Sequence, residues 1–455
     1  MSDITLVNTV FPSEVKVPPQ GLLYLTSALE GAGFDVEIRD YQQGTLPGPW
    51  EPETLASFTE DSADVLGFSA MSYALPLIIS TARLIKQRHP DKRIVLGGIG
   101  PSGAGEQLLE YCPEIDVIVL GEGERTVVDL LAAMRRGNDI GSVSGIIYRQ
   151  GEKVRRTAPR PRIPSLTELA PPAYGRVDFS KYRLVDSQFG RGCPFPCAFC
   201  DIAPYWDRFN TKRPIEHYVA ELETLVKSHG ARDVFIVDDT FVLSRPTILQ
   251  FCDEIRRRNI EFSWGCYARV DLMDEALMER MAAAGCQKIF YGLESGADHV
   301  LEEIDKNITS DLIIERVRQS LEHFPFITAS FVWGFPGESL EDLQSTAYLL
   351  IYLASLGASP QLNLVLPYSY STLYKQYRDQ ITFRPEYSSQ LQFYEGDRGW
   401  ICDMIATSPQ IFSAFYQIPT PDLEEKWQFL NDAGLSPHDL QRAYDHPVPL
   451  AMEIC

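Results

Sequence analysis

The chain has 455 residues, and because a single hydrophobic core stops growing at roughly 250–300 residues, we expect two or three domains. Its 41 basic and 62 acidic residues give a net charge of −21, which argues against a nucleic-acid partner and favours a small-molecule substrate. The amino terminus has no secretory pattern and the apolar runs are too short to span a bilayer, so we expect a cytoplasmic protein without membrane insertion. Nine cysteines in such a chain indicate reduced thiols or metal ligation.

Residues 1–140 alternate short apolar runs with amphipathic stretches. Alternation of this kind predicts a Rossmann-like domain, in which helices cover a parallel, doubly wound sheet. We expect helices near residues 20–31, 75–88 and 125–136, and strands in ITLVNTVF, DVEIRD, VLGFSA, RIVLGG and VIVLGEG.

Residues 141–181 combine a hairpin with a linker. GIIYRQGEKVRR at 145–156 predicts two antiparallel strands that turn at Gln150 and Gly151. The stretch 158–175, APRPRIPSLTELAPPAYG, contains five prolines and no periodicity, which is typical of a linker.

Residues 182–370 repeat a strand and helix pattern six times. Six parallel units in this length predict an open, partial (β/α)6 barrel. The expected strands lie in YRLVDSQFG, DVFIVDD, EFSWGCYAR, KIFYGLES, TASFVWGFP and QLNLVLP. Residues 371–455 are rich in aromatic side chains; we expect a mainly helical region that binds substrate.

The segment RGCPFPCAFCDI at 191–202 holds Cys193, Cys197 and Cys200. It follows the first barrel strand, at the face where such folds place their chemistry. Three thiolates at this spacing can bind three irons of a [4Fe–4S] cluster and leave the fourth iron open to another ligand. A structural zinc ion would want a fourth ligand, and the other six cysteines are scattered singly.

The pattern C-x3-C-x-Φ-C, with Phe199 as its aromatic residue, resembles the signature of radical S-adenosylmethionine (SAM) enzymes. In that family SAM chelates the open iron, and electron transfer cleaves it to a 5′-deoxyadenosyl radical. The resemblance implies SAM contacts at successive strand ends: a carboxylate in VDDTFV for the amino group, an arginine in CYARVD for the carboxylate, a glutamate in YGLESG for the ribose, and glycines in FVWGFPGES for the adenine. A helix cap for the aspartates or glutamate and a salt bridge for the arginine remain alternatives. In chain order these residues are Phe199, Asp238, Asp239, Arg269, Glu294, Gly334 and Gly337.

Three stretches of the first domain, at 18–40, 63–72 and 94–124, resemble the cobalamin-binding domain of the class B radical SAM family. The resemblance implies a corrin between the domains, contacted by loops at 9–17, 69–73, 97–98 and 121–123. The motif D-x-H-x-x-G, which supplies a lower histidine ligand in many cobalamin proteins, is absent; the first histidine, His89, is expected at the opposite edge of the sheet. Ordinary turn glycines in a domain that has lost its cofactor are the alternative. The implied residues are Ser69, Met71, Ser72, Tyr73, Gly97, Gly98, Gly121, Glu122 and Gly123.

The resemblance implies a cobalamin-dependent radical SAM methyltransferase that acts on an unactivated carbon of a small molecule and receives electrons from a reductant such as flavodoxin or ferredoxin. The alternative is a radical SAM enzyme that catalyses cyclisation, C–C coupling or rearrangement, with cobalamin absent or in another role. A scaffold protein with zinc at the three cysteines is a hypothesis from a different class.

Overall fold

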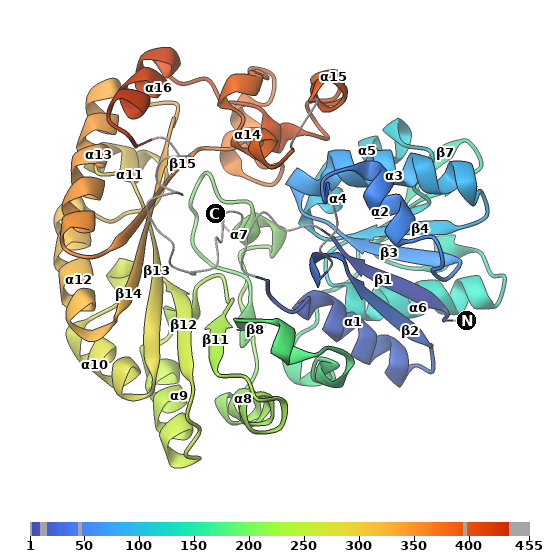
Figure 1. Cartoon of the computed structure of the whole chain (residues 1–455), viewed down its shortest axis with the longest axis horizontal. Coiled ribbons are helices and arrows are strands. Elements are labelled where there is room, and N and C mark those ends of the chain that lie inside the picture. Colours follow the sequence, from blue (N-terminus) through green and yellow to red (C-terminus); the bar gives the residue numbers. More distant parts are fainter. Residues whose placement is uncertain (1, 10–15, 44–47, 395–397, 436–455) are drawn as a thin grey trace. The chain divides into compact units, whose positions relative to one another are not determined.

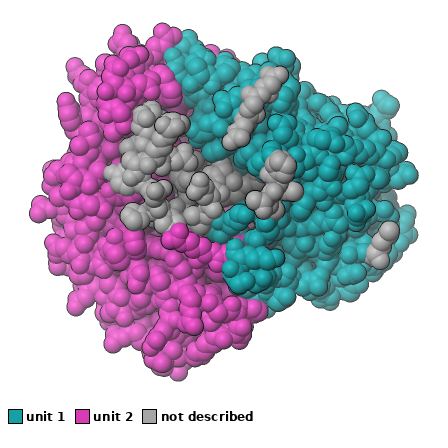
Figure 2. All heavy atoms as spheres, viewed as in Figure 1, with its two compact units in different colours: residues 1–181, 383–416 teal, residues 182–382, 417–455 magenta. Residues whose placement is uncertain are grey.

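The computed structural model describes residues 2–9, 16–43, 48–394 and 398–435. The chain divides into two compact units (Figure 2). Unit 1 contains residues 1–181 and 383–416, and unit 2 contains residues 182–382 and 417–455. The carboxyl-terminal region therefore contributes to both units.

A seven-stranded sheet forms the centre of unit 1, in the order β2-β1-β3-β4-β5-β6-β7. The first five strands are parallel, and the hairpin β6-β7 joins the edge in antiparallel pairing. The strands are β1 (Ile4–Asn8), β2 (Val36–Asp40), β3 (Val65–Ser69), β4 (Arg93–Gly97), β5 (Val117–Val119), β6 (Ile146–Gln150) and β7 (Lys153–Arg156).

Helices lie on both faces of this sheet (Figure 1). Two of them, α1 and α6, pack together, and so do α2 and α3. Buried Leu22, Leu29, Val127 and Leu131 pack against the strands, because their spacing places them on one face of each helix. The helices are α1 (Gln20–Gly31), α2 (Pro52–Phe58), α3 (Leu75–Arg88), α4 (Ile99–Ala104), α5 (Glu106–Tyr111) and α6 (Gly123–Arg135).

Unit 2 is built on a six-stranded, entirely parallel sheet in the order β15-β14-β13-β12-β11-β8. Each strand hydrogen-bonds to the strand of the next βα unit, as in an open barrel (Figure 1). The strands are β8 (Val185–Ser187), β11 (Asp233–Ile236), β12 (Ser263–Ala268), β13 (Cys286–Glu294), β14 (Phe326–Trp333) and β15 (Ser359–Leu364).

Before the carboxyl-terminal region, the helices of unit 2 are α7 (Ile202–Tyr205), α8 (Ile215–His229), α9 (Arg245–Arg257), α10 (Glu275–Ala283), α11 (Asp298–Glu303), α12 (Ser310–His323) and α13 (Leu340–Ser355). Of these, α8, α9, α10, α12 and α13 follow one another along the outer side of the sheet (Figure 1), and each contacts the next in this series.

Short helices dominate the carboxyl-terminal region: α14 (Thr372–Tyr377), α15 (Gly399–Thr407) and α16 (Leu423–Asp432). Of these, α15 belongs to unit 1, whereas α14 and α16 belong to unit 2. In the part of the chain that the structure describes, no helix has the length and apolar character needed to cross a membrane.

The structure confirms the predicted fold class: a Rossmann-like domain, a six-stranded parallel barrel sheet and a mainly helical carboxyl-terminal region. Helices α1 and α3 have the predicted bounds, and the hairpin turns where expected. Helix α6 begins two residues earlier than predicted, at Gly123, directly after the turn that follows β5. Strand β1 ends at Asn8, and residues 10–15 of the predicted 9–17 loop lie outside the described residues.

Candidate active site

The three-cysteine segment starts where the short strand β9 (Gly190–Arg191) pairs with β10 (Thr211–Lys212). Gly192 follows with a φ of 94°, and a Cβ atom there would collide with the backbone oxygen of Phe209. Its N–H donates to Oδ2 of Asp239 at 2.8 Å, and its carbonyl accepts from Asn210. Glycine is therefore required by the fold at the entrance of this segment.

Backbone hydrogen bonds also fix the middle of the segment. The N–H of Ala198 donates to the carbonyl of Ile304 at 2.9 Å, and the carbonyl of Ala198 accepts from the N–H of Leu373 at 2.9 Å. Arg208 donates to the carbonyl of Phe195. Parts of unit 2 that lie far apart in the sequence thus hold the segment between the cysteines.

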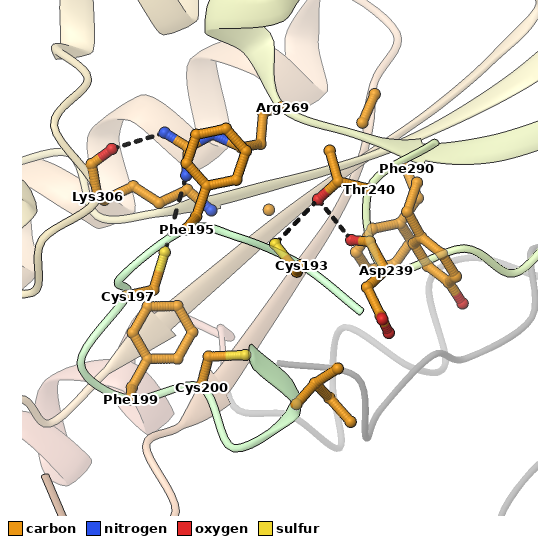
Figure 3. A pocket seen from close by; sticks show the side chains of 14 residues that line it. Cys193, Phe195, Cys197, Phe199, Cys200, Asp239, Thr240, Arg269, Phe290 and Lys306 are labelled. Carbon is orange, nitrogen blue, oxygen red and sulfur yellow. Dashed lines mark hydrogen bonds between the residues drawn. The ribbon is translucent and has the colours of Figure 1, made fainter. Parts of the chain in front are cut away.

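All three cysteines line one pocket in unit 2 (Figure 3). Cys193 and Cys197 are buried, and Cys200 is partly exposed. Sγ of Cys193 lies 3.5 Å from Oγ1 of Thr240, and burial raises the pKa of this thiol. Among the described residues, no three His, Cys, Asp or Glu side chains are close enough to hold a single metal ion. A [4Fe–4S] cluster makes a different demand, because each thiolate binds its own iron.

Arg269, directly after β12, is buried at the edge of the same pocket. Its guanidinium lies 4.0 Å from the centre of the Phe195 ring and 3.7 Å from Sγ of Cys197. It also donates to the carboxylate of Asp271 and to the carbonyl of Lys306 at 2.7 Å. These contacts orient the cation toward the cysteine segment, and they include the salt bridge that was an alternative for this residue.

The two aspartates after β11 occupy different surroundings. Asp239 lines the pocket and binds the N–H of Gly192. Asp238 is buried and does not line the pocket; it accepts the N–H of Phe189 at 2.7 Å. Burial raises the pKa of Asp238 to about 7. Of the pair, Asp239 is therefore the one with access to a ligand, whereas Asp238 holds the backbone before β9.

Glu294, the last residue of β13, is fully buried, with a left-handed φ of 69°. Its Oε1 accepts from Nζ of Lys306 at 2.7 Å. Its Oε2 is also buried and has no hydrogen-bond partner among the described residues. A ligand hydroxyl would satisfy such a carboxylate oxygen, since buried acceptors that stay unpaired cost free energy.

The two glycines of GFPG are required by packing within unit 2. A Cβ atom at Gly337 would collide with the carboxylate of Glu303, and at Gly334, where φ is 86°, it would meet Leu364 at 2.5 Å. The N–H of Gly334 donates to Oε2 of Glu338 at 2.6 Å. Neither glycine lines the pocket. Phe199 does, and its ring contacts that of Phe335 at a centroid distance of 5.7 Å.

In unit 1, the residues predicted to contact a corrin lie in three turns at the carboxyl ends of β3, β4 and β5. The β3 and β4 turns interlock: the N–H of Ala70 donates to the carbonyl of Gly97, and a Cβ atom at Gly98 would collide with the carbonyl of Ala70. By contrast, Gly97 and Gly121 have open space beside their Cα atoms. Gly98 is needed for packing, whereas Gly97 and Gly121 leave room for a ligand.

Two further predicted residues of unit 1 make internal contacts. Glu122 is buried and accepts the N–H of Ile163 at 2.6 Å. Gly123 begins α6 and packs on Leu25. These contacts connect the turn after β5 to the proline-rich segment and to α1.

The turn after β3 carries the remaining predicted residues. Ser69 ends β3, its carbonyl accepting from Thr9, and Met71 and Ser72 lead into a single 3₁₀ turn. Tyr73 is buried: its ring lies 5.9 Å from that of Trp50, and its carbonyl accepts from the hydroxyl of Tyr394 at 2.7 Å. The segment 383–416 thus contacts a predicted cofactor loop.

His89 lies at the end of α3, before β4, where the sequence placed it. Its Nε2 is 2.8 Å from a carboxylate oxygen of Glu60. This is the amino end of β4, opposite the turns described above, so the histidine is remote from the predicted corrin loops.

Sequence reasoning missed eight of the residues that line the pocket: Phe195, Ile202, Thr240, Tyr267, Ala268, Phe290, Gly292 and Lys306. Phe195 and Thr240 stand beside residues that were predicted, and alternation along β12 places Tyr267 on the same side as Arg269. Lys306 had no local signal. It follows α11 in a turn between Asp305 and Asn307, both with positive φ, and it reaches Glu294 only through the fold.

The pocket therefore fits a [4Fe–4S] cluster and SAM in its chemistry. Three thiols can ligate iron, and the carboxylate of Asp239 complements an ammonium group. Glu294 is not among the residues that line the pocket, but its Oε2 is an acceptor without a partner among the described residues. The open space at Gly97 and Gly121 is compatible with a corrin.

Two family matches cover most of the chain. Residues 9–131 match the B12 binding domain, and residues 187–350 match the Radical SAM superfamily. The cofactors predicted from the sequence, a [4Fe–4S] cluster, SAM and cobalamin, are those of these two domains, and this prediction is confirmed.

Curated relatives carry both methyltransferase and cyclase names. The chain is 29% identical over 334 residues to "Uncharacterized methyltransferase PH0819" of Pyrococcus horikoshii, covering 72% of each chain. It is 28% identical over 439 residues to the anaerobic magnesium-protoporphyrin IX monomethyl ester cyclase of Rubrivivax gelatinosus, covering 91% of this chain and 77% of the relative.

The fold is also that of a solved structure, the radical SAM methyltransferase TsrM from Kitasatospora setae, with cobalamin and a [4Fe-4S] cluster bound. The TM-score is 0.70 at 21% identity, and the match covers 99% of this chain and 90% of TsrM. This likeness extends over both units and the carboxyl-terminal region.

Proposed function

We propose that this chain methylates an unactivated carbon of a small molecule. It belongs to the class B radical SAM family, in which a B12-binding domain precedes a radical SAM domain. The observation that carries the proposal is the pocket in which all three cysteines meet Asp239 and Arg269. When bound, the three cofactors supply the electron, the 5′-deoxyadenosyl radical and the methyl group.

The residues of unit 2 would divide the work of binding. Cys193, Cys197 and Cys200 would hold the cluster. Asp239 would accept hydrogen bonds from the SAM amino group, and Arg269 would face the SAM carboxylate with its position fixed by Asp271 and Lys306. Oε2 of Glu294 would accept from a ribose hydroxyl, while Lys306 neutralises the other oxygen. Buried charge pairs of this kind need no rearrangement when the ligand arrives.

Two further groups of predicted residues complete the proposal. Phe199 and the turn at Gly334 and Gly337 would form the adenine side, and Asp238 would support the cysteine segment through Phe189. In unit 1 the predicted corrin contacts are the turns after β3, β4 and β5. A reductant such as flavodoxin or ferredoxin would supply electrons.

The test is anaerobic reconstitution with iron, sulfide, hydroxocobalamin, SAM and a chemical reductant. We expect both S-adenosylhomocysteine and 5′-deoxyadenosine, measured by liquid chromatography and mass spectrometry. A reconstituted protein that forms neither product contradicts the proposal. Cys402→Ala, outside the pocket, is the control for nonspecific effects of thiol removal.

A second candidate function is radical cyclisation without methyl transfer. It is favoured by the cyclase relative, which matches 91% of this chain. This function predicts 5′-deoxyadenosine without S-adenosylhomocysteine in the same assay. An aromatic-rich carboxyl-terminal region that binds substrate would suit a planar or apolar substrate in either case.

A further inference from the structure

A buried ion pair joins α16 to the turn after β14. Nζ of Lys426 lies 3.2 Å from Oε2 of Glu338, and both side chains are completely buried. Burial raises the pKa of the glutamate and lowers that of the lysine, and the charge of each partner opposes the shift of the other. Apolar replacements of buried ion pairs are often at least as stable, so such a pair is better explained by the geometry it enforces.

The pair is the centre of a larger hydrogen-bond network. Lys426 also donates to the backbone carbonyl of Glu338 and to Oγ1 of Thr420. Oγ1 of Thr420 in turn donates to the carbonyl of Phe335 at 2.9 Å, and Oε2 of Glu338 accepts the N–H of Gly334 at 2.6 Å. Every polar contact of this network ends on the turn 334–338 or within the segment 420–426.

The turn 334–338, which this network holds in place, contacts a side chain of the pocket. The ring of Phe335 contacts that of Phe199, which stands between Cys197 and Cys200 and lines the pocket. A change in the position of the turn would therefore move the aromatic wall beside the cysteines. Buried, close-packed side chains transmit such displacements because there is no free volume to absorb them.

We propose that Lys426 is a positioning residue for SAM: through Glu338 it holds the turn 334–338 and Phe199 in the arrangement that receives the adenine. The inference rests on the proposed function of the pocket. It gives helix α16 a role in cofactor affinity, although that helix lies beyond the residues that match the Radical SAM superfamily.

The experiment compares three variants in the full-length protein reconstituted with its cluster: Lys426→Met, the double variant Lys426→Met with Glu338→Gln, and Lys375→Met. Lys375 is an exposed residue of the same carboxyl-terminal region and serves as the matched control. SAM affinity is measured by isothermal titration calorimetry, and the change in the cluster's electron paramagnetic resonance spectrum on adding SAM is recorded. Iron content and Tm are measured in parallel.

We expect Lys426→Met to weaken SAM binding about tenfold or more, because it leaves the carboxylate of Glu338 buried without its cation. Iron content should stay at the wild-type level. The double variant leaves no buried charge unpaired but still lacks the link between α16 and the turn, so it should fold and keep its iron, yet bind SAM at least about threefold more weakly than the wild type. Lys375→Met should bind SAM like the wild type.

Two results would overturn the inference: a Lys426→Met variant with wild-type SAM affinity, or a variant in which affinity falls only in proportion to lost iron. If Lys426→Met does not fold, the double variant decides, since a folded, cluster-containing double variant with wild-type SAM affinity also contradicts the inference. A wild-type protein that holds its cluster and binds no SAM would instead refute the proposed function.

Discussion

The two predicted cofactor regions of this molecule differ in whether side chains or backbone would contact the cofactor. In unit 2 the pocket is lined by groups with their own chemistry, namely three thiols, a carboxylate and two cations. In unit 1 the predicted corrin loops offer mostly backbone, with open space at Gly97 and Gly121. A site made of reactive side chains tolerates little substitution, whereas a site made of backbone depends on which positions can remain without a side chain.

The largest effect is expected from removing one of the three pocket thiols of unit 2. Cys200→Ala removes one of the three proposed cluster ligands, and we expect it to lose most of the bound iron and all formation of 5′-deoxyadenosine. The measurements are iron and sulfide content and the absorbance near 400 nm after anaerobic purification. Cys402→Ala should retain both, and a Cys200→Ala variant with a full complement of iron would refute the assignment.

Two glycine variants test the predicted corrin loops of unit 1. Gly98 has a φ of 104° and no room for a Cβ atom, so Gly98→Ala should destabilise unit 1 by about 2–4 kcal/mol. Gly97→Ala should change stability by less than about 1 kcal/mol and yet weaken hydroxocobalamin binding about tenfold or more, if the open space there receives the corrin. Denaturant unfolding and spectroscopic titration with hydroxocobalamin measure the two effects.

If Gly97→Ala binds hydroxocobalamin as the wild type does, the open space at Gly97 does not receive the corrin. If Gly98→Ala unfolds at the wild-type denaturant concentration, close packing does not require a glycine at position 98.

The two units also differ in how the pKa values of their carboxyl groups are shifted. In unit 2 burial raises the pKa of Asp186, Asp201 and Asp238 to about 7. In the described part of unit 1, every carboxyl pKa with a resolved shift is lowered; the shifts come chiefly from hydrogen bonds. Changes in protonation near neutral pH should therefore affect the stability of unit 2 more than that of unit 1.

Asp186→Asn tests this point. Oδ1 of Asp186 is buried without a hydrogen-bond partner among the described residues. As the pH rises from about 4 to about 7, the unfolded chain loses this proton first, so the native state binds more protons and wild-type stability falls. The asparagine cannot ionise, and the variant should gain about 1–3 kcal/mol relative to the wild type above pH 7.

Thermal unfolding of both proteins between pH 4 and pH 8 measures the difference. Asp178→Asn, at an exposed carboxyl of unit 1, is the control. Parallel curves for the wild type and Asp186→Asn would mean that this carboxyl is already ionised in the native state at neutral pH.

The smallest expected effect concerns the segment 383–416 within unit 1. Tyr394→Phe removes the hydrogen bond to the carbonyl of Tyr73 and keeps the ring contacts with Trp50, so we expect a loss of about 1–2 kcal/mol in the free energy of unfolding. Denaturant unfolding measures it. Tyr377→Phe, on the short helix α14, should change stability by less than about 0.5 kcal/mol. Equal losses in the two variants would mean that the hydrogen bond to Tyr73 makes no specific contribution to stability.

The sequence alone determined the features that depend on neighbours in the chain. Periodicity predicted α1 and α3 to the residue and the six barrel strands in order, because helix and strand periods repeat within a few residues. The C-x3-C-x2-C spacing placed three thiols in one short segment, and the structure lines one pocket with them.

Only the tertiary structure decided which distant groups meet. Lys306 reaches Glu294, Lys426 reaches Glu338, and residues 383–416 join unit 1, none of which leaves a local pattern. It also separated Asp239, in the pocket, from its neighbour Asp238, which serves the backbone. The physical reason is that these contacts depend on the path of the folded chain, and residue types and spacings within a short segment do not fix that path.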